Sequence, residues 1–209
     1  MSTTITTPTK PSKILITGTG RAGTTFLVRL FTLLGMDTGY APDTMENHIW
    51  KHCNAGLERP IGHRTLVVKN PTFLTQLATF HRTMNLFVII PLRELEESAA
   101  SRARNGKNPG GLWGSANKEE QVEAYETMMM RALMDIVQND IQHVFLDFRR
   151  MIASWEYVYE TLRPMMERFG PLDKDKFQAA WEQASELSRP KPENQQDYSH
   201  RRITQKLAT

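Results

Sequence analysis

The chain has 209 residues, of which 40% are hydrophobic and 23% charged, the composition of a globular protein that can bury one sizeable core. No apolar run reaches the roughly 18 residues of a membrane span, and the N-terminus lacks a signal-peptide hydrophobic region, so we expect neither a membrane span nor secretion. A net charge of +3 without a long basic run argues against nucleic acid as a partner, and a single cysteine, Cys53, fits a reducing, cytoplasmic location.

Composition changes divide the chain into three parts. Residues 1–12 are rich in Thr, Ser, Pro and Lys without periodicity, so we expect a disordered leader. Residues 13–188 alternate apolar runs of strand and helix type, which predicts one domain. From Arg189, the sequence Arg-Pro-Lys-Pro ends the helical pattern, and residues 189–209 are predicted to form a polar tail.

The predicted elements follow one another closely in the domain. A short apolar run at 14–16 predicts a strand, and a glycine-studded turn at 18–25 leads into an apolar helix at 26–34. Further strands are predicted at 37–40, 65–69, 85–90 and 142–147. Further helices are predicted at 43–55 (an irregular one), 72–82, 94–104, 119–138, 151–168 and 173–187.

This alternation of strands and helices through short loops predicts an α/β fold, a three-layer arrangement with a parallel sheet and helices on both faces. In such sheets, ligands bind beyond the carboxyl ends of the strands. Three predicted strands end in polar or glycine-rich sequences there: the turn at 18–25, Lys69-Asn70-Pro71 and Pro91-Leu92-Arg93. We therefore expect the functional site at this edge of the sheet.

The turn Gly18-Thr-Gly-Arg-Ala-Gly-Thr-Thr25 joins a strand to a helix, the setting in which a Gly-rich pattern binds phosphate. Its glycines let successive backbone N–H groups point inward, and the helix N-terminus adds the positive end of its dipole. A nucleotide-triphosphate loop reads GxxxxGK[ST]. Here Thr24 stands at the lysine position and the cation comes earlier, as Arg21, so the turn predicts an anion site of another kind.

The sequence GTGRAGTTFL resembles the 5′-phosphosulfate loop of the sulfotransferase superfamily, whose bacterial members often read GxxRSGTTxL. Gly23-Thr24-Thr25 matches outright, Arg21 falls where the family places Arg or Lys, and Ala22 replaces a serine. The resemblance implies a P-loop nucleotide-binding fold and a loop that holds PAPS (3′-phosphoadenosine 5′-phosphosulfate), the activated sulfate donor. The residues implied to bind it are Gly20, Arg21, Ala22, Gly23, Thr24 and Thr25, with Phe26 beside the adenine.

A second pair of residues matches the way in which the family binds the 3′-phosphate of PAPS. The family uses an Arg at the end of a strand and a Ser eight residues later. Pro91-Leu92-Arg93 closes the predicted strand at 85–90, and Ser101 follows Arg93 by eight residues, with Ser98 as a competitor for that role. A guanidinium fork and a hydroxyl suit a phosphate monoester.

The family also implies a lysine near the transferred group and a general base. Lys69, at the end of the strand at 65–69, corresponds to the lysine that neutralises charge near the sulfonyl group. Pro71 stands where animal cytosolic members carry a catalytic His, so that base is missing. Other branches use a Glu about twenty residues after the loop. Our first candidate is Glu46, followed by Asp43, His48 and His52.

The resemblance implies a PAPS-dependent sulfotransferase that moves a sulfuryl group to a hydroxyl or amine and releases PAP. Arg21 and the loop N–H groups would stabilise the charge on the leaving phosphate, and no metal is required. The acceptor is expected to be a small molecule or a glycan, bound by loops 36–64 and 105–118. Trp113, in the second of these loops, is a candidate for a substrate lid.

Two other functions remain open. One is a variant P-loop kinase or NTPase, in which Asp147 ends a Walker-B-like strand and Arg102 and Arg104 act as lid cations. The other is a non-catalytic protein that binds PAP or another nucleotide, since the base is not identified.

Overall fold

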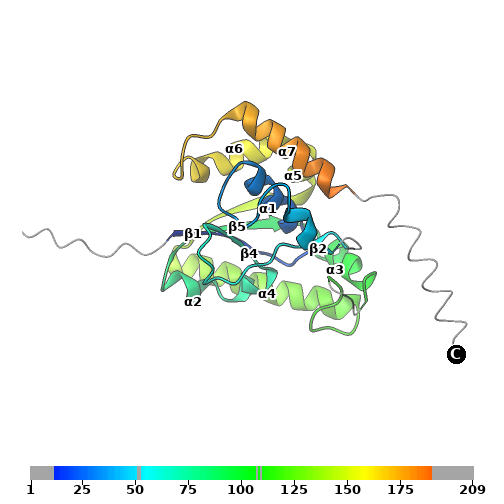
Figure 1. Ribbon diagram of the computed structural model, residues 1–209. Coiled ribbons are helices and arrows are strands. Elements are labelled where there is room, and N and C mark those ends of the chain that lie inside the picture. Colours follow the sequence, from blue (N-terminus) through cyan, green and yellow to red (C-terminus); the bar gives the residue numbers. More distant parts are fainter. Residues whose placement is uncertain (1–11, 51–52, 107, 109, 190–209) are drawn as a thin grey trace, which may run out of the picture.

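The computed structural model describes residues 12–50, 53–106, 108 and 110–189. Its centre is a four-stranded parallel sheet in the order β4-β1-β5-β6 (Figure 1). The strands are β1 (Ser12–Ile16), β4 (Val67–Lys69), β5 (Asn85–Leu92) and β6 (Gln142–Asp147). Residues 1–11 of the leader predicted at 1–12, residues 190–209 of the tail predicted at 189–209, and His52 lie outside the described residues. Ser12, predicted to belong to the leader, begins β1.

Helices cover both faces of the sheet, which confirms the predicted three-layer α/β fold. On one face lie α1 (Thr24–Leu33), α5 (Phe148–Ala153), α6 (Trp155–Met166) and α7 (Lys174–Ser188) (Figure 1). On the other lie α2 (Leu77–His81) and α4 (Lys118–Asn139), and α3 (Leu95–Ala103) follows β5 and packs on α4. Among the described residues, no helix has the length and apolarity that a membrane span requires.

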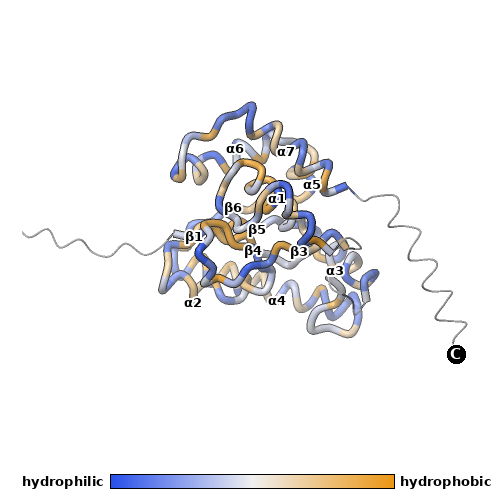
Figure 2. Tube along the Cα trace, in the orientation of Figure 1, coloured by the Kyte–Doolittle hydropathy of each residue, from blue (hydrophilic) through white to orange (hydrophobic). Residues whose placement is uncertain are grey.

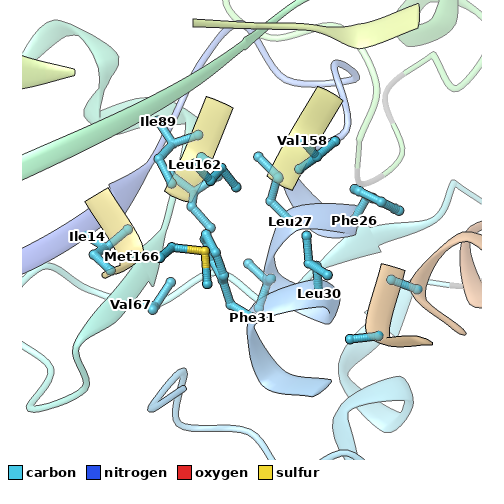
Figure 3. Close-up of a cluster of buried hydrophobic side chains, with 14 of the residues drawn as sticks. Ile14, Phe26, Leu27, Leu30, Phe31, Val67, Ile89, Val158, Leu162 and Met166 are labelled. Carbon is cyan, nitrogen blue, oxygen red and sulfur yellow. The ribbon is translucent and has the colours of Figure 1, made fainter. Parts of the chain in front are cut away.

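The side-chain alternation of β1 supplies both layers of the core. Ile14 and Ile16 point to the α1 face, whereas Leu15 points to the α4 face, and all three are fully buried. Figure 3 shows the cluster of buried apolar side chains on the α1 face, in which Leu30 and Phe31 of α1 pack against the strands and α6. Apolar residues follow the strands through the centre of the molecule, with polar segments outside (Figure 2). Each fully buried Leu or Phe contributes about 1.5–3 kcal/mol.

Two predicted elements before β4 are wrong. Residues 37–40 form no strand, because Gly39 turns the chain with a φ of 73° after a single bond from the Val67 N–H to the Asp37 carbonyl at 2.9 Å. The helix predicted at 43–55 is instead a 3₁₀-helix, η1 (Met45–His48), and a two-stranded pair of β2 (Ile49–Trp50) and β3 (Ala55–Gly56). At Gly56, with a φ of 142°, a Cβ would collide with the His48 carbonyl, so the backbone there favours glycine.

Two predicted helices are each divided. Residues 72–82 form a 3₁₀-helix, η2 (Pro71–Thr75), followed by α2. Residues 151–168 fall into α5 and α6, with Ser154 between them in extended conformation. The Ser154 hydroxyl accepts a hydrogen bond from the Tyr157 N–H at 3.1 Å, which caps α6.

Candidate functional site

A cavity of about 860 Å³ opens at the carboxyl edge of the sheet, a size typical of ligand pockets. All three predicted strand-end sequences line it. Their lining residues are Gly20, Arg21, Gly23, Thr24, Thr25, Phe26, Lys69, Asn70, Pro71 and Arg93. Ala22 and Ser101 are buried and do not line the cavity.

The turn between β1 and α1 presents a row of unpaired amides. From Gly18 to Phe26, no backbone N–H donates a hydrogen bond to any residue that the structure describes. Gly23 begins α1 in the left-handed conformation with a φ of 89°, and a Cβ there would collide with Met151 and lie 3.2 Å from the Phe148 ring. These free donors at a helix N-terminus suit an anion.

Arg21 ties this turn to neighbouring segments. Its Nε donates to the Ser101 Oγ at 3.0 Å, and its Nη1 donates to the Cys53 carbonyl. Within the described part of the chain, no carboxylate pairs with Arg21. Burial lowers the pKa of the Arg21 guanidinium, and the charges of Arg102 and Arg93 add to the lowering. The site therefore holds a cation with no neutralising partner.

Arg93 reaches the same turn from the end of β5. Its Nη1 donates to the Arg21 carbonyl at 3.1 Å, its Nε pairs with Glu97 at 3.1 Å, and its guanidinium lies 4.7 Å from the centre of the Phe148 ring. The structure thus brings Arg21, Arg93 and Ser101 together. Ser98 is fully buried, has no hydrogen-bond partner among the described residues and does not line the cavity.

Lys69 is a second buried cation at the cavity, 2% exposed. Its Nζ donates to the Gly56 carbonyl at 2.8 Å, to the Thr25 Oγ1 at 3.4 Å and to the Glu58 carboxylate. Burial lowers the Lys69 pKa, and Glu58 opposes that change. Lys69 and Thr25 of the turn therefore share one wall of the cavity.

Glu58 was not predicted as a site residue, yet it lines the cavity beside Lys69 with a side chain that is 42% exposed. The segment carrying it is joined to the end of β4 by a hydrogen bond from the Arg59 N–H to the Lys69 carbonyl at 3.0 Å. No motif marks Glu58, since its place depends on this pairing between distant residues.

The predicted base candidates that the structure describes do not line the cavity. Both carboxylate oxygens of Glu46 accept from Arg29, at 2.7 and 2.8 Å. His48 packs its ring against Tyr40, with 5.2 Å between the ring centres. Asp43 also lies outside the lining. The carboxylates that do line it are Glu58 and Glu182.

The two loops expected to define an acceptor both contribute to the lining. Trp50 and Cys53 come from the first loop, and Gly110 and Trp113 from the second. Trp113 is 37% exposed, and its backbone N–H donates to the Gln121 Oε1 at 2.7 Å.

Helix α7 forms a further wall that sequence reasoning missed. Trp181, Glu182, Ser185 and Ser188 line the cavity from this helix. The Trp181 ring meets that of Phe26 edge to face at 6.2 Å, and its Nε1 donates to the Met151 carbonyl at 3.0 Å. These contacts leave an aromatic wall beside the turn.

Asp147, the Walker-B-like candidate, has a local structural role. Its Oδ1 accepts from the Arg150 N–H at 2.8 Å and caps α5, and Asp147 does not line the cavity.

Comparisons with known proteins give limited information. No family model matches this chain, and no curated protein matches it. Among solved structures, the sulfotransferase domain from the curacin biosynthetic pathway matches with a TM-score of 0.44 and 12% sequence identity, over 80% of this chain and 77% of that chain. We therefore infer a function from the chemistry of the site.

Proposed function

We propose that this protein is a sulfotransferase that moves a sulfuryl group from PAPS to a hydroxyl or amine of an acceptor and releases PAP. The observation that carries the proposal is the meeting of Arg21, Arg93 and Lys69 with a row of unpaired turn amides around one cavity. The unpaired Arg21 guanidinium and the free N–H groups suit an anion, and PAPS offers two anionic groups, on the 3′ and 5′ positions of one ribose. The resemblance of the turn to the 5′-phosphosulfate loop indicates that the anion bound there is a phosphosulfate.

In this proposal, the turn and Arg21 hold the 5′-phosphosulfate, and Arg93 holds the 3′-phosphate. Ser101, which lies outside the cavity lining, positions Arg21 instead of contacting the 3′-phosphate. The bond from Arg21 Nε to Ser101 Oγ at 3.0 Å and that from Arg93 Nη1 to the Arg21 carbonyl at 3.1 Å hold the two anion subsites next to each other. Phe26 and Trp181 offer apolar ring surface for the adenine.

The transfer itself needs charge stabilisation and a base. PAPS supplies the sulfuryl group and a phosphate as leaving group. Arg21 and the turn amides stabilise the charge that grows on the leaving oxygen as its bond to sulfur breaks, a contribution worth about 2.7–4 kcal/mol for one donor. We assign the base to Glu58 in place of Glu46, because Glu58 faces the cavity beside Lys69. Glu58 takes the acceptor proton as the new bond to sulfur forms.

Two observations favour this function over a magnesium-dependent kinase. Thr24 occupies the lysine position of the triphosphate loop, and the Asp147 carboxylate is engaged in capping α5.

Calorimetry with PAP, ATP and GTP, each with and without magnesium, tests the proposal. We expect PAP to bind in the micromolar range without metal, and ATP and GTP to bind more weakly because they lack a 3′-phosphate. Magnesium-dependent binding of ATP together with no response to PAP would contradict the proposal.

A further inference from the structure

Arg102, in the last turn of α3, is a buried cation to which the proposed reaction has so far given no role. It is 8% exposed and lines the cavity. Its Nε donates to the Tyr125 hydroxyl and its Nη1 to the Gly111 carbonyl at 2.6 Å, whereas its Nη2 donates to no residue in the described part of the chain. No carboxylate of the described residues pairs with it.

The free end of Arg102 lies directly over the phosphate-loop turn. A Cβ built at Gly20 would collide with Nη2, so the glycine at this position leaves room for the guanidinium. The guanidinium carbon of Arg102 lies 5.7 Å from the centre of the Trp113 ring. The Nε and Nη1 of Arg102 are therefore held by Tyr125 and Gly111, and its Nη2 faces the cavity.

Arg102 lines the same cavity as Arg21 and Lys69, and its charge affects both residues. Burial is the main cause that lowers the pKa of each of these two groups, and the charge of Arg102 lowers both further. Three cations thus share this end of the cavity, and Glu58 is the carboxylate that contacts one of them. Such an excess of positive charge away from water calls for an anion among the three.

A purely structural role explains part of this arrangement. The bonds to Tyr125 and Gly111 join α3 to α4 and to the loop at 105–114. They do not explain why the remaining donor faces the cavity over a glycine, or why the charge is unpaired.

We propose that Arg102 binds the sulfonyl oxygens of the donor, between the turn and Lys69. This inference rests on the proposed function and adds a residue to it. The turn amides and Arg21 then contact the 5′-phosphate, and Arg102 contacts the group that leaves it. Because the sulfonyl oxygens carry charge before and during transfer, a fixed guanidinium there both binds and orients the group.

PAPS and PAP differ only in the sulfonyl group, so the ratio of their dissociation constants isolates this contact. We expect Arg102→Gln to weaken PAPS binding about tenfold or more while PAP changes less than about threefold, both measured by calorimetry. Arg102→Lys keeps the charge and is expected to lose less. Arg104→Gln, two residues away and exposed, removes the same charge outside the cavity lining and should leave the ratio unchanged.

The outcomes separate this inference from the proposed function. Failure of the unmodified protein to bind PAP would refute the proposed function. PAP binding with an unchanged ratio in Arg102→Gln, or equal losses for both ligands, would overturn the role of Arg102 alone. Because Arg102 also joins α3 to α4, thermal melts should show that each variant is folded, and Tyr125→Phe, which keeps Arg102, provides a second test. It loosens the guanidinium and should shift the ratio in the same direction by a smaller factor.

Discussion

At the scale of single residues, two buried cations are each paired with a glutamate but differ in their position relative to the cavity. Arg29 is 1% exposed and donates to Glu46, to the Asn54 Oδ1 at 2.8 Å and to the Ser188 Oγ at 3.0 Å, which engages most of its donors. Lys69 has one partly exposed carboxylate, Glu58, at the wall of the cavity. Arg29 lies outside the cavity and holds the structure together, whereas Lys69 lies on the cavity wall, where a ligand can reach the Lys69–Glu58 pair.

The variant Glu58→Gln keeps the size of the proposed base and removes its ability to take a proton. We expect the release of PAP from PAPS, measured with water as acceptor, to fall about 10²–10⁴-fold. PAP affinity should be unchanged or tighter, because a negative charge beside Lys69 is lost. The control is Glu182→Gln, which alters a carboxylate on another wall of the same cavity and should leave PAP release nearly unchanged.

Glu46→Gln tests the other half of this assignment. Because it breaks a bidentate pair with a buried guanidinium, but at a glutamate that is 39% exposed, we expect a loss of about 1–3 kcal/mol in the free energy of unfolding in urea. PAP release should be retained under conditions where the variant is folded. If Glu46→Gln instead abolished release from a stable protein while Glu58→Gln did not, the base would be Glu46.

At the scale of elements, the sequence predicted what depends on local periodicity. The apolar runs at 86–90 and 144–146 lie within β5 and β6, which lie next to each other in the sheet. Residues 37–40 have a suitable composition but gain a single bond to β4, since Gly39 turns them away. The break at Ser154 depends on a cap whose partner is three residues away, a signal that the apolar period of 151–168 conceals.

The residues of the site were likewise predictable where local sequence determines their position, and not where distant contacts do. Strand-end sequences identified Arg21, Lys69 and Arg93, which line the cavity together, because parallel strands end at one edge. Glu58 and the wall from α7 were missed, since they reach the cavity by pairing and packing between residues far apart in sequence. The roles of these residues in binding and catalysis stay predictions.

The start of α1 offers a test at this scale. In Gly23→Ala, the added methyl meets Met151 and the Phe148 ring at a φ of 89°, so the turn must shift away from α5. We expect a loss of about 1–3 kcal/mol in the free energy of unfolding and at least a tenfold weaker PAP, because the amides no longer converge on one anion. Gly35→Ala is the control: its φ is 81°, but nothing lies within 4 Å of the added methyl. Gly35→Ala should lose only the free energy of unfolding that a side chain costs at a positive φ, and it should bind PAP normally. Equal losses of PAP affinity in both variants would contradict this role of Gly23.

At the scale of the whole molecule, the strand order explains why distant segments meet. β1 lies between β4 and β5, so the turn after β1 has Lys69 on one side and Arg93 on the other. Helices cover both faces but leave the carboxyl edge open, and α3 carries Ser101 and Arg102 back to the same edge. This topology places cationic residues on either side of one turn, which is the arrangement that the proposed function uses.

If Arg93 binds the 3′-phosphate and the turn binds the 5′-group of one nucleotide, removing the Arg93 side chain should weaken nucleotides that carry a 3′-phosphate more than those that lack it. We expect Arg93→Ala to weaken PAP about tenfold or more, and adenosine 5′-phosphosulfate, which has no 3′-phosphate, much less. Arg149→Ala is the matched control, because Arg149 pairs with the same Glu97 but is 70% exposed and does not line the cavity. Calorimetry with both ligands gives the comparison. Equal losses for the two ligands in Arg93→Ala would mean that Arg93 supports the turn through its bond to the Arg21 carbonyl, and the 3′-phosphate would have to be read elsewhere.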